Sequence, residues 1–102
     1  MLLESYTVGG RDRYSAKKVI RPTNFSIFAP EAKAVSIVGD FNQWIPQPMN
    51  RQPDGAWTIQ LPLHHGHHRY QLDVDGQRIL DPRAQGIARN AKNERVSLIA
   101  VS

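Results

Sequence analysis

The sequence contains no cysteine, and this absence excludes a disulfide framework, a thiolate metal site and a cysteine nucleophile. No apolar run is long enough to cross a membrane, and the segment Met1–Ser5 lacks the basic start and apolar stretch of a signal peptide. Neither a GxSxG nucleophile elbow nor a GxxxxGK(S/T) phosphate loop is present, and the aspartates mostly fall in turns. We therefore expect a cytoplasmic protein with no membrane contact, no catalytic centre and no cofactor.

The net charge is a reason to consider nucleic acid as a partner. The 102 residues carry a formal charge of +4, and much of the excess lies between Met1 and Arg21. Such cations attract phosphates whatever the fold. No basic helical face, helix-turn-helix pattern or ribonucleoprotein motif accompanies them. A solvated basic surface is the preferred interpretation, and nucleic-acid binding through the segment Arg11–Arg21 is a third alternative.

One strand and the loop after it organise the rest of the chain. A strand is expected over Ala34–Gly39, because Val35 and Ile37 alternate with a serine at the period of two that gives a strand one buried face. Turn-forming residues then follow, which places Trp44 in a loop. This large aromatic side chain either folds back over the core or is presented to a ligand.

Other short apolar segments predict further strands. They are Val19–Ile20 and Phe25–Ile27, which Pro22 separates, and then Trp57–Leu61, His68–Val74 and Arg95–Val101. Trp57 is in phase with the apolar residues of its segment, so we expect it in the core. Residues 81–93 show little apolar periodicity and predict a long surface loop.

A β-hairpin is expected around Asp75–Gly76, a favoured two-residue turn. This turn places Asp73 opposite Arg78 on the neighbouring strand. Gln71, Asp73 and Arg78 then project from the face opposite Tyr70 and form one polar patch that can hydrogen-bond hydroxyl groups.

About seven short strands joined by glycine and proline turns, with no convincing helix, predict an all-β sandwich. We expect this domain to occupy residues 17–102. Residues 1–16 carry mixed charge and weak periodicity, which predicts an N-terminal arm that is packed on the domain or loosely attached.

Four histidines surround Gly66 in the segment His64–His68, and imidazoles this dense can bind zinc, copper or nickel. A dedicated site needs ligands that a second shell of groups orients, and no carboxylate is adjacent in the sequence. We therefore expect a solvated hairpin loop with His68 partly packed, and no metal site.

Several blocks of the sequence together resemble the family-48 carbohydrate-binding modules, over roughly Val19–Val101. The blocks are Asn24–Pro30, Val35–Trp44, Tyr70–Gly76 and Asp81–Pro82. This family comprises the early-set, immunoglobulin-like domains of isoamylases, glycogen branching enzymes and the β-subunit of AMP-activated protein kinase. The resemblance implies an immunoglobulin-like β-sandwich that binds α-1,4-glucans such as glycogen or starch. Because the sequence shows neither a catalytic constellation nor a catalytic barrel, we expect a stand-alone, non-catalytic module.

The resemblance also implies site residues. Trp44 matches the family tryptophan that stacks on a glucose ring, and Asn93 matches a family asparagine, with Asn90 as the alternative register. Two positions depart from the pattern, because Gln71 stands where the family has a lysine and Arg78 where it has a second tryptophan. The loss of one stacking platform implies weak or vestigial sugar binding.

Arg78 has two interpretations: it lies beneath a sugar ring, or it pairs with Asp73 across the hairpin. The candidate carbohydrate-binding residues are therefore Trp44, Gln71, Arg78, Asn93 and Asp73. The expected partner is an α-glucan polysaccharide or oligosaccharide. The alternative function is a protein-interaction or scaffolding domain that docks a glycogen-metabolising or regulatory protein and retains only a vestigial sugar site.

Overall fold

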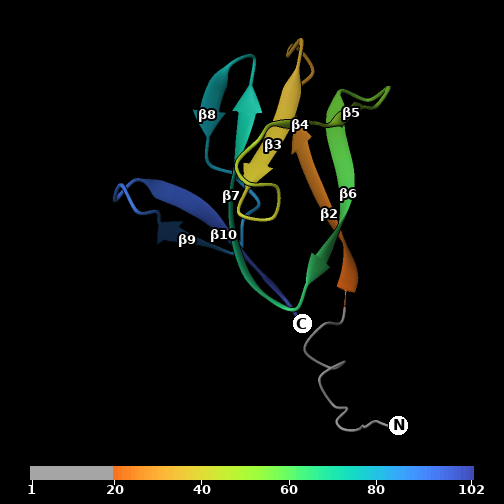
Figure 1. The fold of residues 1–102 in the computed structure, drawn as a ribbon. Coiled ribbons are helices and arrows are strands. Elements are labelled where there is room, and N and C mark those ends of the chain that lie inside the picture. Colours follow the sequence, from red (N-terminus) through yellow and green to blue (C-terminus); the bar gives the residue numbers. More distant parts are fainter. Residues whose placement is uncertain (1–19) are drawn as a thin grey trace, which may run out of the picture.

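The computed structural model describes residues 20–102, and that part of the chain forms strands and turns without a helix (Figure 1). The expected N-terminal arm and most of the basic segment Arg11–Arg21 lie outside the described residues. No described residue belongs to a helix that is long and apolar enough to span a membrane. The strands are β2 (Ile20–Phe28), β3 (Val35–Gly39), β4 (Gln47–Pro48), β5 (Asn50–Arg51), β6 (Ala56–His64), β7 (Gly66–Val74), β8 (Gln77–Ile79), β9 (Gly86–Arg89) and β10 (Arg95–Val101).

These strands form two antiparallel sheets. The larger sheet has the order β4-β3-β7-β10-β9, with β8 beside β7, and the smaller has the order β2-β6-β5. In Figure 1 the orange β2 and the green β6 lie on one side of the molecule, and the yellow β3 and the blue β10 lie on the other. The prediction of an all-β, immunoglobulin-like early-set sandwich is confirmed.

Apolar side chains from both sheets meet in one core. Ile37 and Leu72 of the larger sheet and Phe25 of the smaller are buried members of it, as period-two alternation predicts. Burying one such side chain stabilises the fold by about 1.5–3 kcal/mol. Trp57 is only 6% exposed, and its Nε1 donates to the carbonyl oxygen of Ala29 at 3.0 Å. The expectation that this tryptophan belongs to the core is therefore confirmed.

The prediction that Pro22 separates two extended segments is wrong within the described residues. β2 runs without interruption past Pro22, which lies opposite Pro62 of β6. Among the strands of residues 20–102, β2 lies at the edge of its sheet. A proline is tolerated at an edge position where the missing N–H has no partner strand to bond.

Residues 81–93 are also not the uninterrupted loop that the sequence predicted, because β9 lies within them and pairs with β10. Ala88 stands opposite Val96 in this pairing. β9 has four residues, too few for a period of two to be recognised, and its pairing with β10, the next strand in the chain, makes it a strand. The strand count of about seven was low for a similar reason, since β4 and β5 have two residues each.

The predicted hairpin register is confirmed. Asp73 pairs with Arg78 across β7 and β8. Asp75 and Gly76 form the turn with φ of 52° and 87°, the left-handed region that a two-residue turn of this kind needs. Oδ1 of Asp75 also accepts the backbone N–H groups of Lys33 and Ala34, both at 2.8 Å. The turn aspartate thereby fixes the hairpin to the start of β3.

Candidate functional site

The loop that carries Trp44 is held by local hydrogen bonds. Oδ1 of Asn42 accepts the N–H of Gly39 at 2.9 Å, and its Nδ2 donates to the carbonyl oxygen of Ile37 at 3.2 Å. The N–H of Trp44 donates back to the carbonyl oxygen of Gly39 at 2.9 Å. Gln43 and Trp44 both have φ near +60°, an uncommon conformation for residues other than glycine. The loop therefore turns back sharply and fixes where Trp44 emerges.

Asp40 joins this loop to β7. Its Oδ2 accepts the backbone N–H of Arg69 at 3.0 Å, and its Oδ1 lies 3.2 Å from Nδ1 of His68. The N–H of Asp40 in turn donates to the carbonyl oxygen of Arg69 at 3.0 Å. Two strands that are distant in the sequence thus set the position of the tryptophan loop.

Trp44 lies outside the buried core of the described residues and is half-buried. Met49, which follows in the chain, belongs to the core, and the intervening Pro46 and Pro48 are exposed. Trp44 borders a hollow of about 320 Å³. This Trp44 hollow is lined by Trp44, Gln71, Arg78, Asn90, Ala91, Lys92 and Glu94.

Three of the five predicted site residues, Trp44, Gln71 and Arg78, therefore share one hollow, and they come from a loop, β7 and β8. Nε2 of Gln71 donates to the carbonyl oxygen of Arg95 at 3.3 Å, which leaves its Oε1 as an acceptor. The side chain of Arg78 is about half exposed. The hollow combines an aromatic surface with an amide and a cation, groups that suit a ligand with an apolar face and many hydroxyls.

Asp73 does not line the Trp44 hollow. Its Oδ2 lies 3.8 Å from Nε of Arg78, within reach of an ion pair but beyond a direct hydrogen bond. Such an exposed cross-strand pair contributes only about 0.2–1 kcal/mol to stability. Asp73 thus approaches a residue of the hollow without lining it, and the other guanidinium nitrogens of Arg78 have no ion-pair partner within residues 20–102.

Asn93 also does not line the hollow. It has φ of 63°, its N–H donates to the carbonyl oxygen of Asn90 at 2.9 Å, and its own carbonyl oxygen accepts Nη1 of Arg89 at 2.8 Å. Asn90, the alternative register, does line the hollow. Its Oδ1 accepts the N–H groups of Lys92 and Glu94, both at 2.9 Å, so this side chain holds the loop together.

A second hollow, of about 420 Å³, shares Trp44, Asn90 and Ala91 with the first. We call it the arginine hollow, because Arg69 and Arg89 complete its lining together with Asp40. The sequence analysis selected neither arginine. Their positions on β7 and β9 are brought together by β10, which pairs with both strands, and no local pattern signals that arrangement.

Comparison with known proteins decides the family. A model of the family described as carbohydrate-binding module 48 (isoamylase N-terminal domain) matches residues 13–97. The chain belongs to this family. The resemblance seen in the sequence is thereby confirmed, and the chain is a carbohydrate-binding module of an all-β fold.

Branching enzymes are among its curated relatives. The module is 37% identical over 78 residues to a 1,4-alpha-glucan branching enzyme of Xanthomonas axonopodis pv. citri. The matched region covers 72% of this chain and 11% of the enzyme. The module is 41% identical over 59 residues to that of Novosphingobium aromaticivorans, covering 55% of this chain and 8% of the enzyme. The module therefore spans about a tenth of the length of the relatives it matches.

The histidine cluster of the module lies at the β6–β7 turn. A hollow of about 560 Å³ is lined by His64, His67 and His68 together with Asp40. Nε2 of His68 lies 2.9 Å from the carbonyl oxygen of His64. No carboxylate is adjacent in the sequence, but the fold brings one, Asp40, to His68. Within residues 20–102, no three histidine or carboxylate side chains are arranged to hold a metal ion.

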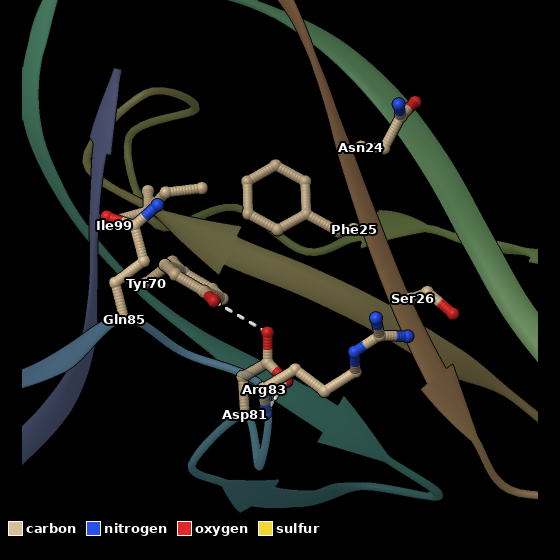
Figure 2. A pocket seen from close by; sticks show the side chains of 8 residues that line it. All are labelled: Asn24, Phe25, Ser26, Tyr70, Asp81, Arg83, Gln85 and Ile99. Atoms are coloured by element: carbon tan, nitrogen blue, oxygen red, sulfur yellow. Dashed lines mark hydrogen bonds between the residues drawn. The ribbon is translucent and has the colours of Figure 1, made fainter. Parts of the chain in front are cut away.

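A polar cavity of about 270 Å³ opens between the two sheets of the module (Figure 2). Figure 2 shows the Tyr70 hydroxyl pointing at the Asp81 carboxylate, with Oδ2 2.6 Å away. Oδ1 of Asp81 accepts the N–H of Arg83 at 2.9 Å, and the N–H of Asp81 donates to Oγ of Ser97 at 2.8 Å. Burial, the hydrogen bond to Asp81 and the charge of that carboxylate raise the pKa of the Tyr70 hydroxyl far above its ordinary value.

The sequence analysis treated Asp81 as a turn residue and missed this pair. Asp81 does accept a backbone N–H two residues on, as a turn aspartate does. Tyr70 lay in phase with buried residues, and a buried tyrosine hydroxyl usually has a hydrogen-bond partner. The burial of Tyr70 therefore predicts that its hydroxyl has a hydrogen-bond partner, but the identity of that partner depends on the fold.

Proposed function

We propose that this module binds α-1,4-glucan, such as glycogen or a starch-like chain, without catalysing a reaction. The observation that carries the proposal is that Trp44, Gln71 and Arg78 line one hollow on a carbohydrate-binding module. The relatives named above act on 1,4-alpha-glucan, as their names state, and this supports the choice of sugar. The cytoplasmic location stays a prediction.

Trp44 supplies the stacking surface in this proposal. The axial C–H groups of a pyranose present an apolar, slightly positive face, which packs on the negative face of the indole. Oε1 of Gln71 accepts a hydrogen bond from a sugar hydroxyl, because the amide nitrogen is already bonded to Arg95. Arg78 donates to further hydroxyls, and Asp73 holds it in place.

The affinity is expected to be weak, since one aromatic platform acts alone. Arg78 occupies the position of the second tryptophan in the family pattern, and a guanidinium presents less apolar surface than an indole. Asn93 contributes through the shape of its loop, because its backbone bonds to Asn90 and Arg89.

Affinity electrophoresis through gels that contain glycogen tests the proposal. We expect the gel to retard the unmutated module and Trp44→Ala to lower the affinity at least about tenfold, a loss of about 1.4 kcal/mol. Ile45→Ala is the matched control, because Ile45 is the neighbouring residue, is 63% exposed and lines neither hollow. If glycogen does not retard the unmutated module, the proposal is wrong.

The alternative is that the module docks a glycogen-metabolising or regulatory protein. Large exposed apolar side chains favour it, above all Phe28, which is 69% exposed at the end of β2, an edge strand within the described part of the chain. An exposed edge strand and an apolar side chain together suit a protein contact. Capture of a purified branching enzyme by the module, weakened by Phe28→Ser and accompanied by no glycogen binding, would favour this alternative.

A further inference from the structure

The arginine hollow carries more positive charge than a neutral sugar needs. Arg69 and Arg89 line it, and Asp40 is the one acidic residue in its described lining. Both oxygens of Asp40 are engaged, one by the N–H of Arg69 and one by His68. The carboxylate is thus directed at the backbone and an imidazole.

Neither guanidinium of the hollow has a carboxylate within ion-pair distance among residues 20–102. Arg89 donates one bond, from Nη1 to the carbonyl oxygen of Asn93, and this contact orients the side chain. An arginine has five N–H donors in a planar fork, so most of them remain available. Planar guanidinium groups with free donors are the side chains that best match the oxygens of a phosphate.

The same excess continues into the Trp44 hollow, which shares Trp44, Asn90 and Ala91 with the arginine hollow. Arg78 and Lys92 line it against a single acidic residue, Glu94. Glu94 is partly engaged, because its Oε1 accepts Nδ2 of Asn90 at 2.9 Å. A ligand that lies across Trp44 therefore meets cations on either side of the shared residues.

We propose that the arginine hollow binds a phosphate monoester carried by the α-glucan chain that stacks on Trp44. The ligand class is thus a phosphorylated α-glucan. Arg69 and Arg89 hold the phosphate oxygens, while Trp44 and Gln71 hold the adjacent sugar units. This inference rests on the proposed glucan binding and adds that the module prefers glucan chains that carry phosphate.

A single-stranded nucleic acid also combines phosphates with flat rings, and the observations favour the glucan over it. Sequence-tolerant nucleic-acid sites use several aromatic side chains for successive bases, whereas Trp44 is the one aromatic residue that lines either hollow within the described residues. The family of the chain is also one of carbohydrate-binding modules. Binding of nucleic acid at this site is therefore treated as a result of the experiment that would contradict the inference.

The experiment measures the affinity of the module for a phosphorylated starch dextrin and for the same dextrin after phosphatase treatment, at about 0.05 M salt so that screening is weak. We expect about tenfold tighter binding to the phosphorylated dextrin, the contribution of charge-assisted hydrogen bonds. Arg69→Gln should lose most of this preference and keep its affinity for the dephosphorylated dextrin, because the contacts of Arg69 with Asp40 are made by its backbone. Arg83→Gln is the matched control, because it removes the same charge from a residue outside both hollows.

The outcomes separate this inference from the proposed function. Equal, Trp44-dependent binding to both dextrins would leave glucan binding standing and overturn the inference. Absence of binding to either dextrin would instead overturn the proposed function, and the inference with it. Competition by a thymidine oligonucleotide as effective as that by the dextrin, or displacement by equimolar inorganic phosphate, would also contradict a site for glucan-borne phosphate.

Discussion

The hydroxyl of Tyr70 donates to Oδ2 of Asp81 across 2.6 Å, and the two residues are only 1% and 7% exposed. Tyr70 belongs to β7, the strand that also carries Gln71, whereas Asp81 opens the segment that runs through β9 to the Asn90 turn. This buried bond therefore connects the centre of the larger sheet to the segment that closes one side of both hollows. Loss of this bond should therefore lower the stability of the fold more than it changes contacts between the hollows and a ligand.

Tyr70→Phe should lower the free energy of unfolding by about 1–3 kcal/mol, because it leaves a buried carboxylate oxygen without its donor. Urea denaturation near neutral pH measures this loss. A double-mutant cycle with Asp81→Asn tests the cause, and the coupling between the two residues should be about 0.5–3 kcal/mol. If the double variant lost as much stability as the two single variants together, the hydrogen bond would not couple the two residues, and the explanation would be wrong.

The same tyrosine predicts a specific loss of stability in alkali. The folded-state pKa of Tyr70 lies far above the ordinary value of 10.0, so above that pH the unfolded chain loses this proton and the folded chain keeps it. The contribution is fully present below pH 10.0 and falls by about 1.4 kcal/mol per pH unit above it. Urea denaturation at about pH 9 and about pH 11 should show a steeper decline for the unmutated module than for Tyr70→Phe. Equal slopes would contradict the prediction.

Truncation of the two tryptophans should lower the stability of the fold by very different amounts. Trp57→Ala removes a 6% exposed core side chain and its bond to Ala29, so we expect a loss of about 3–5 kcal/mol, enough to unfold a marginal domain. Trp44→Ala should cost about 1 kcal/mol or less, because the side chain lies outside the core. Thermal denaturation followed by circular dichroism compares them. A large stability loss from Trp44→Ala would show that the residue supports the fold.

Arg78→Trp should strengthen binding to a neutral maltodextrin about fivefold, since it places a second indole in the Trp44 hollow. The side chain at this position is about half exposed and lies on a strand, where an aromatic residue is well tolerated. Isothermal titration with maltoheptaose gives the affinity. Arg78→Gln removes the charge without adding a ring and serves as the control, which should show no gain.

Much of the fold could be predicted from the sequence, because period-two alternation and turn residues act locally. β3, β10 and the Asp75–Gly76 hairpin were expected at or within one residue of their observed bounds. The errors came from features that period-two alternation does not report. β9 has too few residues for a pattern of its own, and β2 continues through Pro22, which lies at a sheet edge among the described strands.

The candidate site was only partly predictable. The hairpin register and the loop position placed Trp44, Gln71 and Arg78, and the fold brings these three to one hollow. Asn93 was chosen by resemblance over Asn90, but Asn90 lines the hollow and Asn93 does not. Arg69 and Arg89 carried no signal, since they become neighbours only through their common partner β10.

The all-β class, the burial of Trp57 and the family could be inferred before the fold was known, because alternation, turn residues and the order of the sequence blocks are read along the chain. The bond from the Tyr70 hydroxyl to Asp81, and the two arginines that share a hollow with Trp44, become evident only in the folded chain. Hydrogen-bond partners and charge clusters depend on which strands pair across the sheet. That pairing is set by burial of the whole core, a sum over residues far apart in the chain.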